Sequence, residues 1–345
     1  MTRLSNISTY RTALMGIAIV VVFLYHSSEA TCFGLPVLHY VRNTTHIVDV
    51  FMLLSAFGLC YSHKRDGDTA AFVRRRFTRI FPTYWLVIGA YHILSVVTLN
   101  FKPEFAQWLQ HPTSIVQALY YYSTLGWWAH PLQPHIYYYD WYVPTIVLFY
   151  LLFPAMIAFA RSTAKAAVLV IASLAFSVVC ALLYGTYDGE SFLFLSFTRL
   201  PVFALGILIF YLKENHDARR GAVAVALCVA LVAILHTPAL HFTDRTQVII
   251  TSTIVVTLYT TGLSLILALP MRIGLIKRCF DFLGSISLEL FLVHIMVIAA
   301  VRKFLGWEHW QVCVAFCIGG SSLCRAPGSE APHPAHRQTN LTLHT

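Results

Sequence analysis

Charged residues are scarce in this sequence. Asp, Glu, Lys and Arg make up 11% of its 345 residues, whereas 58% are hydrophobic. A water-soluble domain carries about 25% charged residues, so this composition excludes an ordinary soluble protein. Acidic residues are the scarcest, with 15 Asp and Glu against 24 Lys and Arg. The net charge of +9 does not indicate a nucleic-acid partner, because the basic residues lie beside apolar runs, as in a membrane protein.

Several familiar motifs are also absent. There is no G-x-x-x-x-G-K-[ST], G-x-G-x-x-G or H-E-x-x-H sequence. The eight cysteines are scattered, and Cys313 and Cys317 form only a C-x3-C inside an apolar stretch. We therefore expect neither a disulfide framework nor a metal site. The first apolar run has no small-residue cleavage site, so no cleavable signal peptide is predicted.

Long apolar runs are abundant. A helix needs about 20 mostly apolar residues to cross a bilayer. Nine segments satisfy this requirement: 10–28, 45–62, 80–99, 141–160, 166–184, 192–212, 221–236, 247–270 and 281–301. A tenth begins near residue 311 and then loses its hydrophobicity. The sequence therefore predicts an all-α fold, a polytopic transmembrane helical bundle of about nine to ten spans.

Two segments do not fit this pattern. Residues 114–128 are moderately apolar, and we interpret them as an interfacial helix. Residues 319–345 have the composition of a disordered segment, in contrast to the membrane domain predicted over residues 1–318. Either a natural tail or a shifted reading frame would account for the end of the chain.

The distribution of Lys and Arg predicts the orientation. With the N-terminus in the cytoplasm and the spans alternating, 16 basic residues face the cytoplasm and 5 face outward; one lies in a span and two in the tail, which accounts for all 24. This bias fits the positive-inside rule. It also argues against segment 114–128 as a span, because a further span there would move every later loop to the opposite side of the membrane. The sequence thus predicts a multi-pass protein of the inner or plasma membrane.

Five ionisable side chains share one depth in these spans. With the orientation above, the outer half of the membrane holds His26, Asp49, Arg199, Glu289 and His294. Trp141 and Tyr142 begin the fourth span on the same side. Ionisable groups inside a membrane are costly, so their gathering at one depth favours a functional site.

Each of these residues also has a structural interpretation. His26 could reach toward the interface, and Asp49 could stabilise the start of a helix through the helix dipole. Arg199 and Glu289 could pair with each other only for packing. A proton relay in a transporter would use the same groups, so they do not by themselves distinguish an enzyme from a carrier.

A second concentration of charge is the segment "FVRRRFTRIFPTYW", residues 72–85. Arg75, Arg76 and Arg79 share a helix face, because residues three or four apart are neighbours on a helix. Such a face could hold phosphates through forked, charge-assisted hydrogen bonds. A basic loop that only sets membrane orientation is the alternative.

Six stretches together resemble acyltransferase family 3, the polytopic membrane enzymes that O-acylate cell-surface sugars. In chain order they are "GIAIVVVFLYHS", "VDVFMLLSAFGLCYS", "FVRRRFTRIFPTYWL", "WYVPTIVLFYLLFP", "TRLPVFALG" and "LGSISLELFLVHI". Three positions depart from the family pattern. Met15 and Ala56 stand where the family commonly has Arg and Gly, and "WYVPTI" lacks an acidic residue. Arg11, one turn before Met15, is the candidate replacement.

The resemblance implies transfer of an acyl group, usually acetyl, from acyl-CoA to a sugar hydroxyl, with no permanently bound cofactor. His26 would be the base, oriented by Asp49 or Glu29. The acyl-CoA would be held by Arg11, Arg75, Arg76 and Arg79, and the acceptor by Arg199, Glu289, His294 and Trp141. The aromatic residues Trp127, Trp128 and Tyr137 to Tyr139 would stack on sugars or form an interfacial belt.

The sequence therefore predicts a membrane O-acyltransferase with a glycan or glycolipid acceptor. A proton-coupled polytopic transporter is the alternative; no inverted repeats are detectable in the sequence, which argues against it. An acyltransferase acting on a lipid or a small amino compound is a third interpretation. The predicted geometry is an internal cavity that joins the Arg76–Arg79 region to His26.

Overall fold

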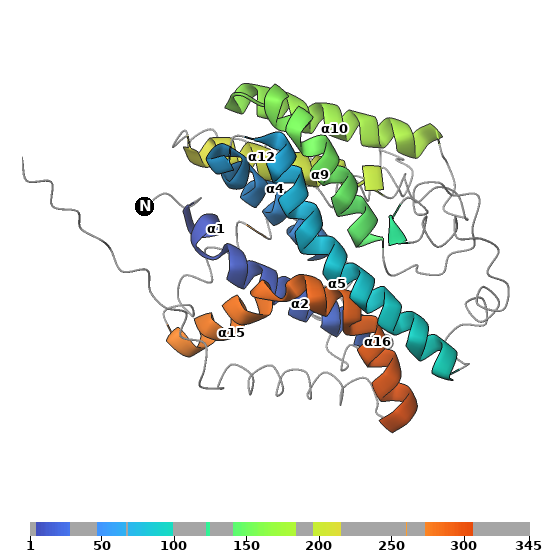
Figure 1. Cartoon of the computed structure of the whole chain (residues 1–345). Helices are drawn as coiled ribbons and strands as arrows, with labels where there is room; N and C mark the ends of the chain where they lie inside the picture. The colour runs from blue at the N-terminus through green and yellow to red at the C-terminus, as the bar shows by residue number, and fades with distance from the viewer. Residues whose placement is uncertain are drawn as a thin grey trace, which may run out of the picture.

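The computed structural model describes residues 5–27, 47–66, 68–98, 122–124, 141–183, 196–214, 260 and 273–305. Over these residues the chain is helical and contains no strand, which confirms the all-α prediction. The helices are α1 (Ser5–Thr9), α2 (Arg11–Ser27), α4 (Ile47–Asp66), α5 (Thr69–Thr98), α9 (Tyr142–Phe159), α10 (Thr163–Leu183), α12 (Leu200–Glu214), α15 (Gly274–Ser285) and α16 (Ser287–Leu305) (Figure 1).

Three of these helices are long and apolar enough to cross a membrane. They cover Ile47–Arg65, Tyr142–Phe159 and Thr163–Cys180, and α2 is a shorter apolar helix. Helix α10 exposes large apolar side chains along its length, among them Val168 and Ile171. A helix that is apolar on all sides and yet exposed suits a lipid environment rather than water. These helices therefore support a membrane protein.

The packing divides the helices into two groups that α5 bridges. Helix α2 packs against α15, α4 and α16, while α12 packs against α4 and α10. Figure 1 shows α2, α15 and α16 together on one side of the bundle and α9, α10 and α12 on the other, with α5 running diagonally across. Helix α4 contacts both groups, so it lies at the centre of the bundle.

Helix α5 begins earlier than the predicted span at residue 80. Its first residue is Thr69, and the carboxylate of Asp68 accepts hydrogen bonds from the backbone N–H groups of Ala70 (2.9 Å) and Ala71 (3.3 Å). An aspartate at this position satisfies N–H groups that would otherwise lack partners at the helix start. The basic segment is therefore part of the helix, and its arginines are fixed on helix faces.

The predicted span 281–301 is not one straight helix. Helices α15 and α16 meet at Ile286 with a bend of 77°. At the bend the hydroxyl of Ser285 donates to the carbonyl of Phe282 at 2.7 Å. Serine hydroxyls compete in this way with the regular helix bonds. Ser287, the first residue of α16 after the bend, is buried.

Close backbone approaches hold α15 and α4 to their neighbours. A Cβ atom added to Gly284 would lie 1.8 Å from the carbonyl oxygen of Thr12 on α2. One added to Gly206 on α12 would lie 2.3 Å from the carbonyl oxygen of Leu53 and 2.8 Å from the Cβ of Ala56. Small residues are common where membrane helices pack this closely. Ala56, which departs from the family pattern, faces a glycine that leaves room for its methyl group.

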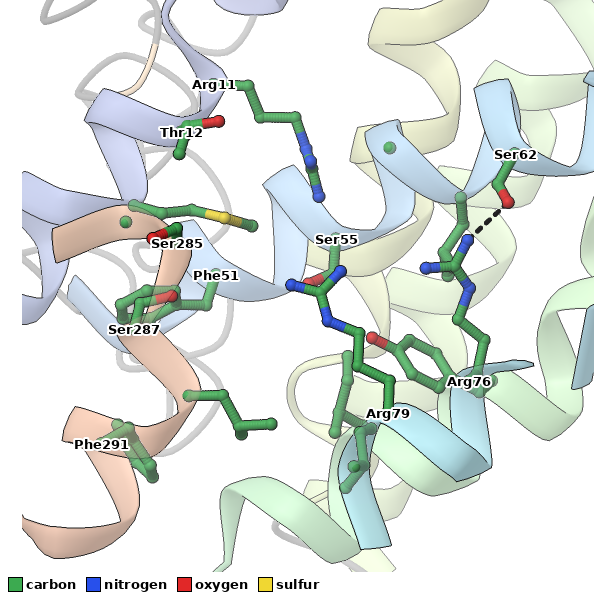
Figure 2. A pocket seen from close by; sticks show the side chains of 18 of the residues that line it. Arg11, Thr12, Phe51, Ser55, Ser62, Arg76, Arg79, Ser285, Ser287 and Phe291 are labelled. Carbon is green, nitrogen blue, oxygen red and sulfur yellow. Dashed lines mark hydrogen bonds between the residues drawn. The ribbon is translucent and has the colours of Figure 1, made fainter. Parts of the chain in front are cut away.

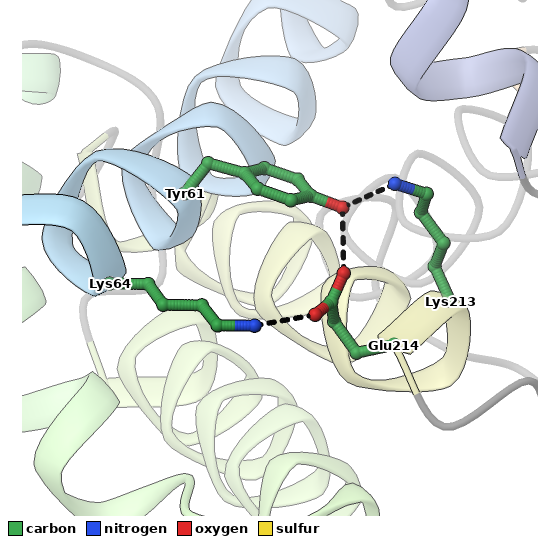
Figure 3. A network of polar contacts seen from close by, with 4 residues as sticks. All are labelled: Tyr61, Lys64, Lys213 and Glu214. Carbon is green, nitrogen blue, oxygen red and sulfur yellow. Dashed lines mark hydrogen bonds and ion pairs between the residues drawn. The ribbon is translucent and has the colours of Figure 1, made fainter. Parts of the chain in front are cut away.

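The C-terminal ends of α4 and α12 are joined by a polar network (Figure 3). Lys64 donates to Glu214 at 2.7 Å, and Lys213 donates to the hydroxyl of Tyr61 at 2.6 Å. Tyr61 in turn donates to Glu214 at 3.3 Å. The hydrogen bond from Lys64 lowers the pKa of Glu214 below its usual value. The network fixes the position of α4 relative to α12 at this end of the bundle.

Several predictions lie outside the described residues. They are the spans 221–236 and most of 247–270, the start of a tenth span near 311, nearly all of the interfacial segment 114–128, the tail 319–345, Glu29 and the aromatic residues Trp127, Trp128 and Tyr137 to Tyr139. The predicted boundary at residue 318 and the count of nine to ten spans stay predictions.

Candidate functional site

A cavity of about 680 Å³ lies between α2, α4, α5, α9, α15 and α16. One face of α4 forms a wall of this cavity, with the residues Phe51, Ser55, Gly58, Ser62 and Arg65. They are spaced three or four apart, and a helix rises about 1.5 Å per residue, so the wall is about 21 Å long. The cavity is therefore elongated along the bundle.

Four arginines from three helices enter this cavity, which we call the arginine cavity. They are Arg11 of α2, Arg65 of α4, and Arg76 and Arg79 of α5. Figure 2 shows Arg11 approaching from one side, and Arg76 and Arg79 from the other. The described residues that line the cavity include no carboxylate. The cavity is thus positively charged and suited to phosphate groups, which guanidinium groups bind by paired hydrogen bonds.

Arg11 is held in place by the backbone of α4. Its Nε atom donates to the carbonyl of Leu54 at 2.9 Å. Its guanidinium group lies against Gly58, where an added Cβ atom would be 2.6 Å from the guanidinium carbon. Met15 lines the same cavity. Arg11 therefore supplies a positive charge close to the place where the family commonly has an arginine.

Arg76 is positioned by a hydrogen bond to the hydroxyl of Ser62 (Figure 2). Its guanidinium carbon also lies 5.3 Å from the centre of the Phe72 ring. Arg75, predicted to share the phosphate-binding face, is exposed and is not among the lining residues. Of the three arginines predicted to form this face, only Arg76 and Arg79 line the cavity.

Three aromatic rings close the other end of the arginine cavity. The rings of Tyr142 and Phe291 are 4.9 Å apart, those of Phe51 and Tyr142 6.1 Å, and those of Phe51 and Phe291 6.5 Å. We call these residues the aromatic triad. They line the cavity at the Phe51 end of the face of α4.

The two predicted histidines meet beside the aromatic triad. The ring of His294 lies 5.4 Å from that of Phe291 and 4.9 Å from that of His26. The Nε2 atom of His294 is 3.3 Å from the Nδ1 atom of His26. Neither histidine lines the cavity; the triad residue Phe291 does, and it contacts His294, which contacts His26. The predicted cavity that joins the Arg76–Arg79 region to His26 is therefore not confirmed, because the observed cavity contains the arginines but is not lined by His26.

Asp49, Arg199 and Trp141 form a third cluster beside the aromatic triad. Arg199 donates to the carboxylate of Asp49 at 2.7 Å, and Asp49 is buried in the first turn of α4. The guanidinium carbon of Arg199 lies 5.6 Å from the centre of the Trp141 ring. This cluster ties the starts of α4, α9 and α12 together. Whether Asp49 orients His26 or binds an acceptor stays a prediction.

Glu289 lies apart from these clusters. It is exposed in the first turn of α16, where a negative charge is favourable for the helix dipole. Further polar residues that were not predicted line the cavity, among them Arg65, Ser55 and Tyr150. Ser55 and Tyr150 were detectable, since both are polar residues within predicted spans. Arg65 was counted only as an orientation signal.

The fold and these clusters define a helical membrane protein with an arginine-lined cavity near a pair of histidines. The acyltransferase domain model of acyltransferase family 3 matches residues 12–324, which is most of the chain. The chain therefore belongs to this family and is a membrane acyltransferase. No curated protein and no solved structure matches the sequence.

Proposed function

We propose that this protein transfers an acyl group, most simply acetyl, from acyl-CoA to a hydroxyl of a glycan or glycolipid. The observation that carries the proposal is the arginine cavity, with four guanidinium groups and no carboxylate among its described lining residues. The phosphates of acyl-CoA are the anions that an acyltransferase has to hold. An alternative function as a proton-coupled transporter leaves this cavity without a role, and family membership favours the enzyme.

In this proposal acyl-CoA lies along α4. Its phosphates bind Arg76, Arg79, Arg11 and Arg65, and its pantetheine arm extends past Ser55 toward the aromatic triad. The wall of about 21 Å gives the elongated ligand a path through much of the bundle. The acyl group then lies against the apolar rings, next to the histidines. Charge recognition and placement of the thioester are thereby assigned to opposite ends of one cavity.

His26 is the proposed general base. Its imidazole takes the proton of the acceptor hydroxyl while the hydroxyl oxygen attacks the thioester carbon. The tetrahedral intermediate collapses with cleavage of the C–S bond, and the departing thiolate of CoA takes the proton back from His26. An O-acyl ester and free CoA are the products. For this step the acyl group has to pass Phe291 and His294 to reach His26, because neither histidine lines the cavity.

The acceptor enters from the His26 end of the bundle, where Asp49, Arg199 and Trp141 gather. Sugars suit this cluster, because a carboxylate and a guanidinium bind hydroxyl groups and an indole ring packs against a sugar face. With the charge bias of the loops, this end faces outward and the N-terminus and arginine cavity face the cytoplasm. The protein is then a multi-pass protein of the cell membrane. A lipid or small amino acceptor is the remaining alternative.

The proposal is tested with labelled acetyl-CoA. Membrane vesicles that contain the protein should form alkali-labile acetyl esters, and His26→Ala should abolish this product, because general-base catalysis contributes about 10²–10⁴-fold to such rates. The variant should retain its expression level and its saturable binding of acetyl-CoA, since His26 lies outside the arginine cavity. Normal ester formation by His26→Ala would exclude His26 as the base. Label in alkali-stable amides would point to an amino acceptor instead.

A further inference from the structure

His294 lies between the aromatic triad and His26. Its side chain is buried, with 4% exposed, and it belongs to α16, whereas His26 belongs to α2. A buried polar ring requires hydrogen-bond partners. Each of the two ring nitrogens of His294 has one, and the chemical character of these partners determines where the protons are.

The first partner is the backbone carbonyl of Phe291, which lies within hydrogen-bond distance of the Nδ1 atom of His294. A carbonyl oxygen can only accept, so Nδ1 of His294 carries the proton. In the neutral ring the lone pair is then on Nε2. This is the atom that faces His26, at 3.3 Å from its Nδ1 atom.

His26 is consequently bound to two acceptors. Its Nδ1 atom lies 3.3 Å from Nε2 of His294 and 3.2 Å from the carbonyl oxygen of Val22, one turn earlier on α2. Both contacts require a proton on Nδ1 of His26. The neutral ring therefore has its lone pair on Nε2, on the opposite side of the imidazole.

We infer that His294 is a positioning residue that holds His26 in the tautomer whose Nε2 atom is the base. The inference rests on the proposed role of His26 and differs from the substrate contact that the sequence suggested for His294. When Nε2 of His26 takes a proton, the Nδ1–H group keeps its bonds to His294 and Val22. The imidazolium is thereby stabilised and cannot rotate. In serine hydrolases a carboxylate has this role; here a neutral imidazole and a carbonyl share it.

Two substitutions separate the hydrogen bond from packing. His294→Gln keeps an acceptor oxygen near the position of Nε2, whereas His294→Leu has a similar volume and no acceptor. We expect His294→Leu to lower kcat for transfer from labelled acetyl-CoA by about 10–100-fold, as for other residues that orient a functional imidazole. His294→Gln should stay within about fivefold of the wild type. Both should keep the KM for acetyl-CoA, since His294 does not line the arginine cavity.

Three kinetic outcomes would overturn the inference. The first is an unchanged kcat in His294→Leu, and the second is an equal loss of kcat in both variants. The third is a change confined to the KM for the acceptor. The last would restore the substrate contact. Loss of transfer in His26→Ala together with normal kcat in His294→Leu would refute only this inference, whereas full transfer in His26→Ala would refute the proposed base.

The tautomer itself can be observed in the wild-type protein, so this test does not depend on how the His294 variants fold. Nitrogen-15 NMR of histidine-labelled protein in detergent at a pH where His26 is neutral should show His26 with its proton on Nδ1. Its signals are assigned by their loss in His26→Ala. A proton on Nε2 of neutral His26 would contradict the inference whatever the kinetics of the variants.

Discussion

At the scale of single residues, the position of Arg11 depends on the absence of a side chain at residue 58. Gly58→Ala would place a methyl group 2.6 Å from the guanidinium carbon of Arg11. Because the end of an arginine side chain can move aside, we expect the protein to fold normally while the guanidinium leaves its place. Losing one charge-assisted hydrogen bond should weaken acetyl-CoA binding about tenfold. Equilibrium dialysis with purified protein measures this change.

Gly89→Ala is the matched control for this prediction. It makes the same substitution in a helix, but nothing lies within 4 Å of the added Cβ atom. Binding by Gly89→Ala should equal that of the wild type. Unchanged binding by Gly58→Ala would mean that Arg11 does not contact the acyl-CoA.

A second prediction concerns the buried ion pair of Asp49 and Arg199. Asp49 is 1% exposed, so Arg199→Met would leave its carboxylate buried without the guanidinium. Breaking a buried ion pair on one side costs about 3–5 kcal/mol. We expect a clearly lower midpoint of thermal unfolding in detergent for Arg199→Met, and a similar decrease for Asp49→Leu.

The double variant Asp49→Leu/Arg199→Met separates the contribution of the ion pair to stability from the contribution of each residue by itself. Replacing both charges by apolar groups should recover much of the lost stability, because neither charge remains buried alone. A double variant as unstable as the sum of the two single ones would contradict a direct pairing. Its transfer activity would show separately whether the cluster binds the acceptor.

For single residues, the sequence predicted the depth of a side chain in the membrane better than its contacts with other side chains. His26 and His294 were assigned to the same half of the membrane, but their direct contact depends on the rotation of α2 and α16 about their axes, which hydrophobicity does not determine. For the same reason Arg75 was grouped with Arg76 and Arg79, although it does not line the cavity. The spacing of a motif identifies a helix face; the neighbouring helices determine which of its residues enter a cavity.

At the scale of helices, the crossing of α2 and α15 depends on glycine. Gly284→Ala would place a Cβ atom 1.8 Å from the carbonyl oxygen of Thr12, and a backbone atom cannot move aside as a side chain can. We expect a loss of about 1–3 kcal/mol, as for other overpacked sites, seen as a lower unfolding midpoint in detergent. Acetyl-CoA binding should weaken as well, because Gly284 and Thr12 both line the arginine cavity.

Gly274→Ala in the same helix is the control, since nothing lies within 4 Å of its added Cβ atom. It should unfold at or above the wild-type temperature, because alanine favours helix more than glycine does. Equal destabilisation by both substitutions would show that the close crossing is not the cause.

Hydrophobicity predicted the existence of the described helices well and their ends less well. The spans near 45–62 and 141–160 overlap most of α4 and α9, because a long apolar run with few charges admits little else in a membrane. The bend at Ile286 was missed, since hydrophobicity averaged over the run 281–301 does not resolve a local break in a helix. The early start of α5 was missed for the opposite reason: its first turns are basic, and the cap at Asp68 is a local signal that a hydrophobicity window ignores.

At the scale of the whole molecule, three clusters meet at the aromatic triad. The arginine cavity ends on it, Phe291 contacts His294, and Tyr142 contacts Trp141 with ring centres 6.4 Å apart. In the proposed reaction the donor, the base and the acceptor therefore occupy three sides of one small apolar region. The central claim is that the donor side is the arginine cavity.

The most direct test of this claim is the binding of acetyl-CoA to the purified protein in detergent, compared between two double variants. Arg76→Gln/Arg79→Gln removes two charges inside the cavity, whereas Arg74→Gln/Arg75→Gln removes two exposed charges from the same helix outside it. Hydrogen bonds to charged groups contribute about 1.5–3 kcal/mol each, so the first variant should bind at least about 100-fold more weakly. The second should remain within about threefold of the wild type. Equal binding by both variants, or a larger loss in the second, would contradict the account.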